Sequence, residues 1–193
     1  MIRITLNYLD DTKYGIWLTL TSFLTWFTFF EIGLGSGLKN KLAEALARKD
    51  YNLGKIYVST TYAILSIIIS IVGVLFLFIN SYIDWTVVLN TEKSLAKELN
   101  LLALIVFSFF FLRFVLKLIG IVFMADQRPA ISNSFGPIGN LLSLILIYFL
   151  TLSSEGSLIY IGLVLSAVPI LVLIIVSIYF YLGEYRRNVN EAN

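Results

Sequence analysis

Two cations and one carboxylate lie within segments that are otherwise strongly apolar. Arg113 and Lys117 are four residues apart in the segment 99–124, so both fall on one face of a helix. Glu31 lies in the segment 14–38. A guanidinium binds phosphate or carboxylate oxygens through two parallel hydrogen bonds, and an ammonium adds a point charge. These residues predict a binding site for an anionic molecule.

The position of these charges is energetically costly. A charge at the middle of a bilayer costs at least ~2.5–3.5 kcal/mol, and Arg113 lies roughly 17 Å from the inner end of its segment at 1.5 Å per residue. One interpretation is an ion pair between Glu31 and either Arg113 or Lys117 that joins two helices. Two cations against one carboxylate leave a positive charge in surplus, which favours a cationic face that binds a ligand.

Small and polar residues recur at helical spacing on the same segments. Two of these stripes are Thr21, Thr25, Thr28, Glu31, Gly35 and Asn133, Gly136, Asn140, Ser143. Two interpretations stay open: close helix packing, which hydroxyls and glycines alone favour, and a hydrated cavity between helices, which the charges favour. A cationic, hydroxyl-lined cavity suits an anionic or polyhydroxylated ligand, and sugar diphosphates are both. The predicted ligand-binding residues are Arg113, Lys117, Glu31, Thr28 and Asn140.

The residue types also exclude several kinds of chemistry. The chain has no Cys and no His, which excludes disulfides, thiolate zinc sites, Cys nucleophiles and His-based acid–base catalysis. The pair Asp10-Asp11 has no third ligand nearby, so we interpret it as a surface turn. We therefore predict no metal site, no cofactor and no enzymatic activity.

The composition predicts that lipid surrounds the elements that carry these residues. Apolar residues make up 59% of the 193 residues and charged residues 13%, whereas soluble domains have about 45–50% and ~25%. A helix needs about 20 apolar residues to cross the bilayer. Five segments qualify: 14–38, 56–79, 99–124, 131–152 and 158–182. We predict one all-α transmembrane domain over residues 1–193, a polytopic membrane helix bundle.

The distribution of Lys and Arg predicts the orientation of the bundle. Most of the connector cations fall on one side, in 39–55, at Arg128 and at Arg186-Arg187, and this side is predicted to be cytoplasmic. The C-terminus is then inside and the N-terminus of this chain outside. The basic stretch 38–50 is predicted to be a solvated end of the first span, in preference to a helix on the membrane surface. Trp85 is predicted at the outer membrane interface.

Several motifs resemble those of a known family. The more specific pair is Tyr14-Gly15-Ile16-Trp17-Leu18 and Phe30-Glu31-Ile32-Gly33-Leu34-Gly35-Ser36-Gly37-Leu38-Lys39-Asn40-Lys41. Weaker ones are Ser59-Thr60-Thr61-Tyr62, Ile83-Asp84-Trp85, Val88-Leu89-Asn90 and Ala125-Asp126-Gln127-Arg128-Pro129-Ala130. In these the chain resembles the Wzx-type O-antigen and polysaccharide flippases of the multidrug/oligosaccharidyl-lipid/polysaccharide exporter superfamily.

The resemblance implies a fold and a function. Members of this family are expected to have twelve helices in two lobes around a central cavity. They move polyprenyl-diphosphate-linked oligosaccharide across the bacterial inner membrane during surface polysaccharide biosynthesis. This chain is then expected to match helices two to six, with residues 1–13 forming the end of helix one and an outer loop. A second lobe, as a separate polypeptide, is an expected partner because alternating access needs two bodies.

Other functions are compatible with the same residues. One is a drug or metabolite exporter of the same superfamily, with a less cationic cavity. Another is a small non-catalytic membrane subunit or an inactive truncated product. A membrane enzyme acting on polyprenyl phosphates is disfavoured because the chain has no His and its carboxylates are scattered.

Overall fold

The computed structural model describes the backbone of residues 2–153 and 156–185, and the side chains of 4–25, 35–152 and 156–182. Within these ranges the chain is helical and has no strand. The long helices are α1 (Ile2–Ala47), α2 (Tyr51–Asn80), α4 (Ala96–Leu116), α6 (Pro129–Ser153) and α7 (Leu158–Tyr179). The shorter elements are α3 (Trp85–Val88), η1 (Lys93–Leu95), α5 (Leu118–Ala125) and a π-helical end, η2 (Phe180–Tyr185).

Four stretches of the described chain are long and apolar enough to cross a membrane. They are Tyr51–Asn80, Lys93–Ala125, Pro129–Leu152 and Leu158–Leu182, and they match four of the predicted spans. The predicted span 14–38 lies within α1, whose side chains over 26–34 are outside the described part. The fold prediction is confirmed: the chain is an all-α polytopic membrane helix bundle.

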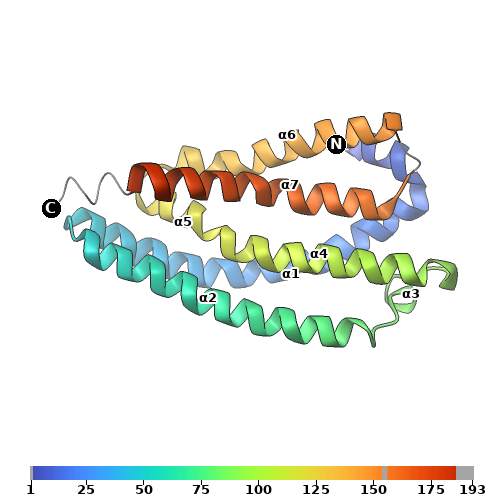
Figure 1. The fold of residues 1–193 in the computed structure, drawn as a ribbon, viewed down its shortest axis with the longest axis horizontal. Helices are drawn as coiled ribbons and strands as arrows, with labels where there is room; N and C mark the ends of the chain where they lie inside the picture. The colour runs from blue at the N-terminus through green and yellow to red at the C-terminus, as the bar shows by residue number, and fades with distance from the viewer. Residues whose placement is uncertain (1, 154–155, 186–193) are drawn as a thin grey trace.

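The α4–α5 span lies at the centre of the bundle. It packs against α1, α2, α6 and α7, and Figure 1 shows α1–α2 and α6–α7 on opposite sides of it. The α1–α2 and α5–α6 turns lie at one end of the long axis, and the α2–α4 and α6–α7 connections lie at the other. We call the first the basic end, because its turns contain Arg48, Lys49 and Arg128, and the second the far end.

The first helix bends sharply near its start. Asp10 has left-handed backbone angles (φ 68°, ψ 167°), and its side chain accepts a hydrogen bond from the Lys13 amide at 2.9 Å. The turns before this bend fold back beside α6 (Figure 1). Just after the bend, the Lys13 ammonium donates to the Gly156 carbonyl at 2.9 Å and so links α1 to the connection between α6 and α7. Residues 4–9 are therefore helical and packed, and the bend replaces the outer loop predicted there.

The end of α1 continues without a break into the predicted basic stretch. Leu38 and Leu42 are buried with Val58 of α2 and Phe114 of α4. A Cβ on Gly54 would lie only 3.2 Å from Leu42 Cδ1, so α2 approaches α1 closely here. The apolar face of this stretch therefore packs on α2, and its position relative to the membrane stays a prediction.

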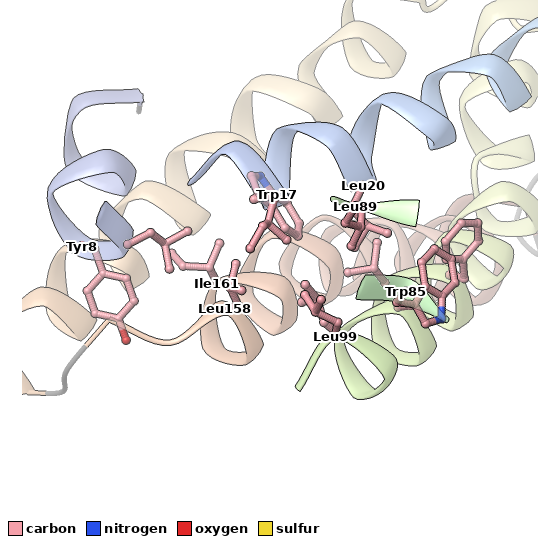
Figure 2. Close-up of a cluster of buried hydrophobic side chains, with 14 of the residues drawn as sticks. Tyr8, Trp17, Leu20, Trp85, Leu89, Leu99, Leu158 and Ile161 are labelled. Carbon is pink, nitrogen blue, oxygen red and sulfur yellow. The ribbon is translucent and has the colours of Figure 1, made fainter. Parts of the chain in front are cut away.

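A hydrophobic cluster closes the far end of the bundle. Figure 2 shows Trp17 of α1 near Leu158 and Ile161 of α7, and Leu20 of α1 near Leu89. These residues and Leu99 of α4 belong to one buried cluster. The side chains of this cluster come from α1, from α3 and the residue that follows it, and from α4, α6 and α7. No cavity is therefore expected to reach the far-end surface through these residues.

The indole of Trp85, which is predicted at the outer membrane interface, is buried inside the protein. Trp85 is at the far end but only 6% exposed, and its ring centroid lies 5.9 Å from that of Phe107. Its indole N–H donates to Asn80 Oδ1 at 2.9 Å, and the Asn80 amide donates to Asn100 Oδ1 at 3.0 Å. An indole can be buried when its N–H finds an acceptor, and Asn80 supplies one inside the protein.

Candidate functional site

Three cations line one cavity of about 480 Å³ on the basic side of the bundle centre. Arg113 and Lys117 come from the central span and Lys39 from α1. Arg113 and Lys117 are half-buried, whereas Lys39 is exposed at the rim. Its wall also carries polar groups: Ser36, Ser132 and Asn133. We call this space, which is lined by α1, α2, α4, α5, α6 and α7, the inner cavity.

The central span is interrupted where it carries the second cation. Lys117 lies between α4 and α5, and its amide donates to the Arg113 carbonyl at 2.9 Å. The next turn is tight, because the Gly120 amide donates to the Lys117 carbonyl three residues before it, also at 2.9 Å. The predicted helix 99–124 is thus two helices in line. Arg113 and Lys117 nevertheless line the same cavity.

A second cavity of about 280 Å³ lies between α1, α4 and α7. We call it the distal cavity, because it reaches Trp17 at the far-end cluster. Both cavities are lined by Arg113, Phe114 and Lys117, so these side chains form the boundary between them. On α1 the described lining of the inner cavity is Gly35, Ser36 and Lys39, and that of the distal cavity is Trp17, Thr21, Leu24 and Thr25.

The five residues predicted to bind a ligand have different outcomes. Arg113 and Lys117 line both cavities. Thr28 and Glu31 belong to helix α1, and their side chains are outside the part of the chain that the structure describes. Asn140 is exposed on α6 and lines neither cavity.

Asn140 misses the inner cavity because α6 and α7 come together beside it. A Cβ on Gly139 would lie 3.2 Å from the Pro169 Cα, so the two backbones are nearly in contact there. The inner cavity therefore ends one turn earlier on α6, where it is lined by Asn133 and Gly136.

The glycines of the polar stripes divide between packing and cavity. A Cβ on Gly162 would lie 2.5 Å from Leu102 Cδ1, and one on Gly35 would lie 2.9 Å from Ile121 Cδ1. These two glycines allow close helix packing. Nothing lies within 4 Å of a Cβ on Gly136, which lines the inner cavity. Gly35 and Gly136 both line the inner cavity, so Gly35 combines close packing with a place in the cavity wall, and hydration of the cavity stays a prediction.

The electrostatics of the inner cavity favour anions. Its lining includes three cations: Lys39, Arg113 and Lys117. In surroundings of low dielectric constant, such charges act on a ligand more strongly than they would in water. A guanidinium and two ammonium groups can donate several charge-assisted hydrogen bonds to phosphate oxygens. The cavity can therefore hold an anionic group, and among the described residues no cluster could hold a metal ion.

Lys39 is the cavity residue that the sequence interpretation missed, since it was counted only as a connector cation. A signal for it exists. Lys39 follows Gly35 by four residues, so it continues the spacing of the stripe on α1.

Comparisons with known proteins do not assign the chain to a family. No family model, no curated protein and no solved structure matches the chain.

Proposed function

We propose that this chain forms the anion-binding part of a transport path for polyprenyl-diphosphate-linked oligosaccharide in the bacterial inner membrane. The observation that carries the proposal is the inner cavity, where Lys39, Arg113 and Lys117 line one space together with the polar residues Ser36, Ser132 and Asn133. The motif resemblance to Wzx-type flippases supports the identity of the ligand. The transport activity and the identity of the ligand are both part of the proposal, whereas the membrane helix bundle is observed.

The cavity suits a diphosphate that is attached to a lipid. A diphosphate offers several oxygens to a guanidinium fork and to two ammonium groups. The rim of the inner cavity includes Ser36, Lys39, Asn133 and Gly136, which are exposed. A ligand can therefore place its phosphates in the cavity while its polyprenyl chain stays in the surrounding bilayer.

The role proposed for this chain is binding and passage, not bond chemistry. The hydrophobic cluster fills the far end of the described bundle (Figure 2), and the proposed entry route for the ligand is from the basic end. Movement of the ligand to the far end requires the cluster to open. Alternating access of this kind involves two bodies that move about a central site, and a second lobe or polypeptide is the proposed second body.

A series of ligands that differ only in charge tests the proposal. Purified protein in lipid nanodiscs is titrated with undecaprenyl diphosphate, undecaprenyl phosphate and undecaprenol, with affinity measured by thermophoresis. We expect the diphosphate to bind most tightly and the alcohol to bind no better than bulk lipid. Equal affinity for all three lipids would contradict the proposal. A lipophilic drug cation that competes with the diphosphate would favour the exporter alternative instead.

A further inference from the structure

The connection between α2 and α4 exposes large apolar side chains. Of the described residues outside α1 and the four membrane-length stretches, those with exposed large apolar side chains are Tyr82, Val87 and Val88, and Tyr82 and Val87 are 89% and 73% exposed. All three lie at the far end of the bundle, where Figure 1 shows α3. We call residues 82–88 the far-end turn. Large apolar side chains that gather at one exposed place mark an interaction surface.

The direction of these side chains is fixed by what the far-end turn buries on its other side. Trp85 and Thr86 are both buried. The amide and the hydroxyl of Thr86 donate to Asp84 Oδ1 at 3.0 and 2.6 Å, so Asp84 caps α3. Because Trp85 and Thr86 face the protein, the next two residues, Val87 and Val88, face away from it. The turn is thus a small amphipathic unit whose outer side is apolar.

The exposed apolar surface continues from the end of α2. Leu75, Phe78 and Ile79 are exposed just before the far-end turn, and α2 buries little of its surface inside the protein. The apolar run 56–79 is about 35 Å long at 1.5 Å per residue, enough to cross a hydrocarbon core of about 30 Å. Figure 1 shows α3 past the end of α2 along the long axis. The far-end turn therefore lies at the level where hydrocarbon gives way to lipid head groups.

The chemistry of the connection suits this boundary. Tyr82 combines an apolar ring with a hydroxyl group, a combination that is enriched at membrane interfaces. Further along the connection the residues become hydrophilic, since 92–94 are Glu, Lys and Ser and all three are exposed. The change from apolar to charged residues with distance from α2 matches a passage from lipid to water.

From these observations we propose that the far-end turn is an interfacial membrane anchor. It inserts Tyr82, Val87 and Val88 among the phospholipids of the leaflet at the far end, whatever ligand the inner cavity holds. Trp85 joins the turn to Asn80 at the end of α2 by a hydrogen bond of 2.9 Å, and Asn80 in turn donates to Asn100 of α4. An anchor at this point therefore sets the depth of both helices in the bilayer.

Fluorescent labels on single cysteines locate the turn in the bilayer. The chain has no Cys, so Val87→Cys, Ser94→Cys and Ile71→Cys each take one bimane label at an exposed position. The proteins are placed in phosphatidylcholine nanodiscs with lipids that carry a nitroxide near the head group or deep in the acyl chain, and iodide is the aqueous quencher. An interfacial anchor holds the Val87 label about 5–10 Å into the boundary. We expect the shallow nitroxide to quench this label most, iodide to quench the Ser94 label most, and the deep nitroxide to quench the Ile71 label most.

A charge variant tests whether the valines cause the insertion. With the label on Tyr82→Cys, the double variant Val87→Asp/Val88→Asp is expected to lose quenching by the shallow nitroxide and to gain quenching by iodide. The matched control Asn90→Asp/Ser94→Asp makes the same change in net charge at exposed positions of the same connection and is expected to keep the quenching pattern of the natural sequence. An unchanged thermal unfolding temperature in detergent shows that each variant is folded.

The quenching patterns decide the outcome without any ligand. Iodide quenching of the Val87 label as strong as that of the Ser94 label would overturn the anchor. A Val87 label that neither nitroxide lipid nor iodide can reach would also overturn it, because that pattern means contact with another protein chain. Neither result bears on the diphosphate site, which has its own titration.

Discussion

Neutralising the two cations of the central span is the perturbation that the structure makes most informative. In Arg113→Gln/Lys117→Gln the side chains keep much of their length and their ability to form hydrogen bonds, but the charge is lost. Both residues line the inner and distal cavities, so one double variant removes charge from the boundary between them. Lys39 remains at the rim and retains part of the attraction for an anion.

The expected loss of affinity follows from the strength of charged hydrogen bonds. A hydrogen bond to a charged group contributes about 1.5–3 kcal/mol, so two lost interactions correspond to about 3–6 kcal/mol. Since about 1.4 kcal/mol is a factor of ten, undecaprenyl diphosphate should bind roughly 100- to 10,000-fold more weakly. The lower end of that range applies because both side chains are only half-buried and water weakens such interactions.

The assay is a titration of undecaprenyl diphosphate into nanodisc-embedded protein, with thermophoresis as the readout. The matched control is Lys93→Gln/Lys97→Gln, which makes the same change in net charge at exposed positions in η1 and at the start of α4. The control should bind within about twofold of the natural protein, because exposed distant charges are screened. Less than a threefold difference between the two double variants would refute the role given to Arg113 and Lys117.

Three further predictions concern stability and orientation. Asn80→Ala leaves a buried indole N–H without its acceptor, so it should cost about 1–3 kcal/mol and lower the thermal unfolding temperature in detergent. Gly162→Val overpacks the contact between α7 and α4 and should cost about 1–3 kcal/mol in the same assay. Gly37→Val, where nothing lies within 4 Å of a Cβ, should have a much smaller effect, and equal melting of the two glycine variants would contradict this assignment. Because the chain has no natural Cys, Lys49→Cys should react with an impermeant maleimide only from the cytoplasmic side and Lys93→Cys only from outside; the reverse pattern would invert the predicted orientation.

The long helices could be predicted from sequence because their apolar runs are unbroken. The predicted span 56–79 lies inside α2 (Tyr51–Asn80), and 158–182 matches α7 with its π-helical end. Lipid-facing helices need only length and hydrophobicity, and both can be read without knowing the neighbours. The interruption at Lys117 and the bend at Asp10 could not be predicted from sequence. Both depend on local backbone geometry, and Lys and Asp also occur within regular helices.

The cavity could be predicted only in part, because helix spacing fixes a face but not what that face meets. Asn133 and Asn140 lie on one stripe of α6, yet only Asn133 lines the inner cavity. The difference arises from α7, which closes on α6 at Gly139. Trp85 faces inward for a similar reason, since its acceptor Asn80 lies at the end of another helix. Such partners become visible only when the helices are placed together.

The most direct test of the cationic cavity is to locate the bound head group. Undecaprenyl diphosphate with a photoreactive diazirine next to the phosphates is cross-linked to the protein in nanodiscs, and the modified peptides are identified by mass spectrometry. We predict modification within 113–124 and 132–136, which line the inner cavity, and its loss in competition with unlabelled undecaprenyl diphosphate. Modification confined to the exposed outer surface of α2, with the same pattern from a diazirine-labelled undecaprenol, would contradict a diphosphate site in this cavity.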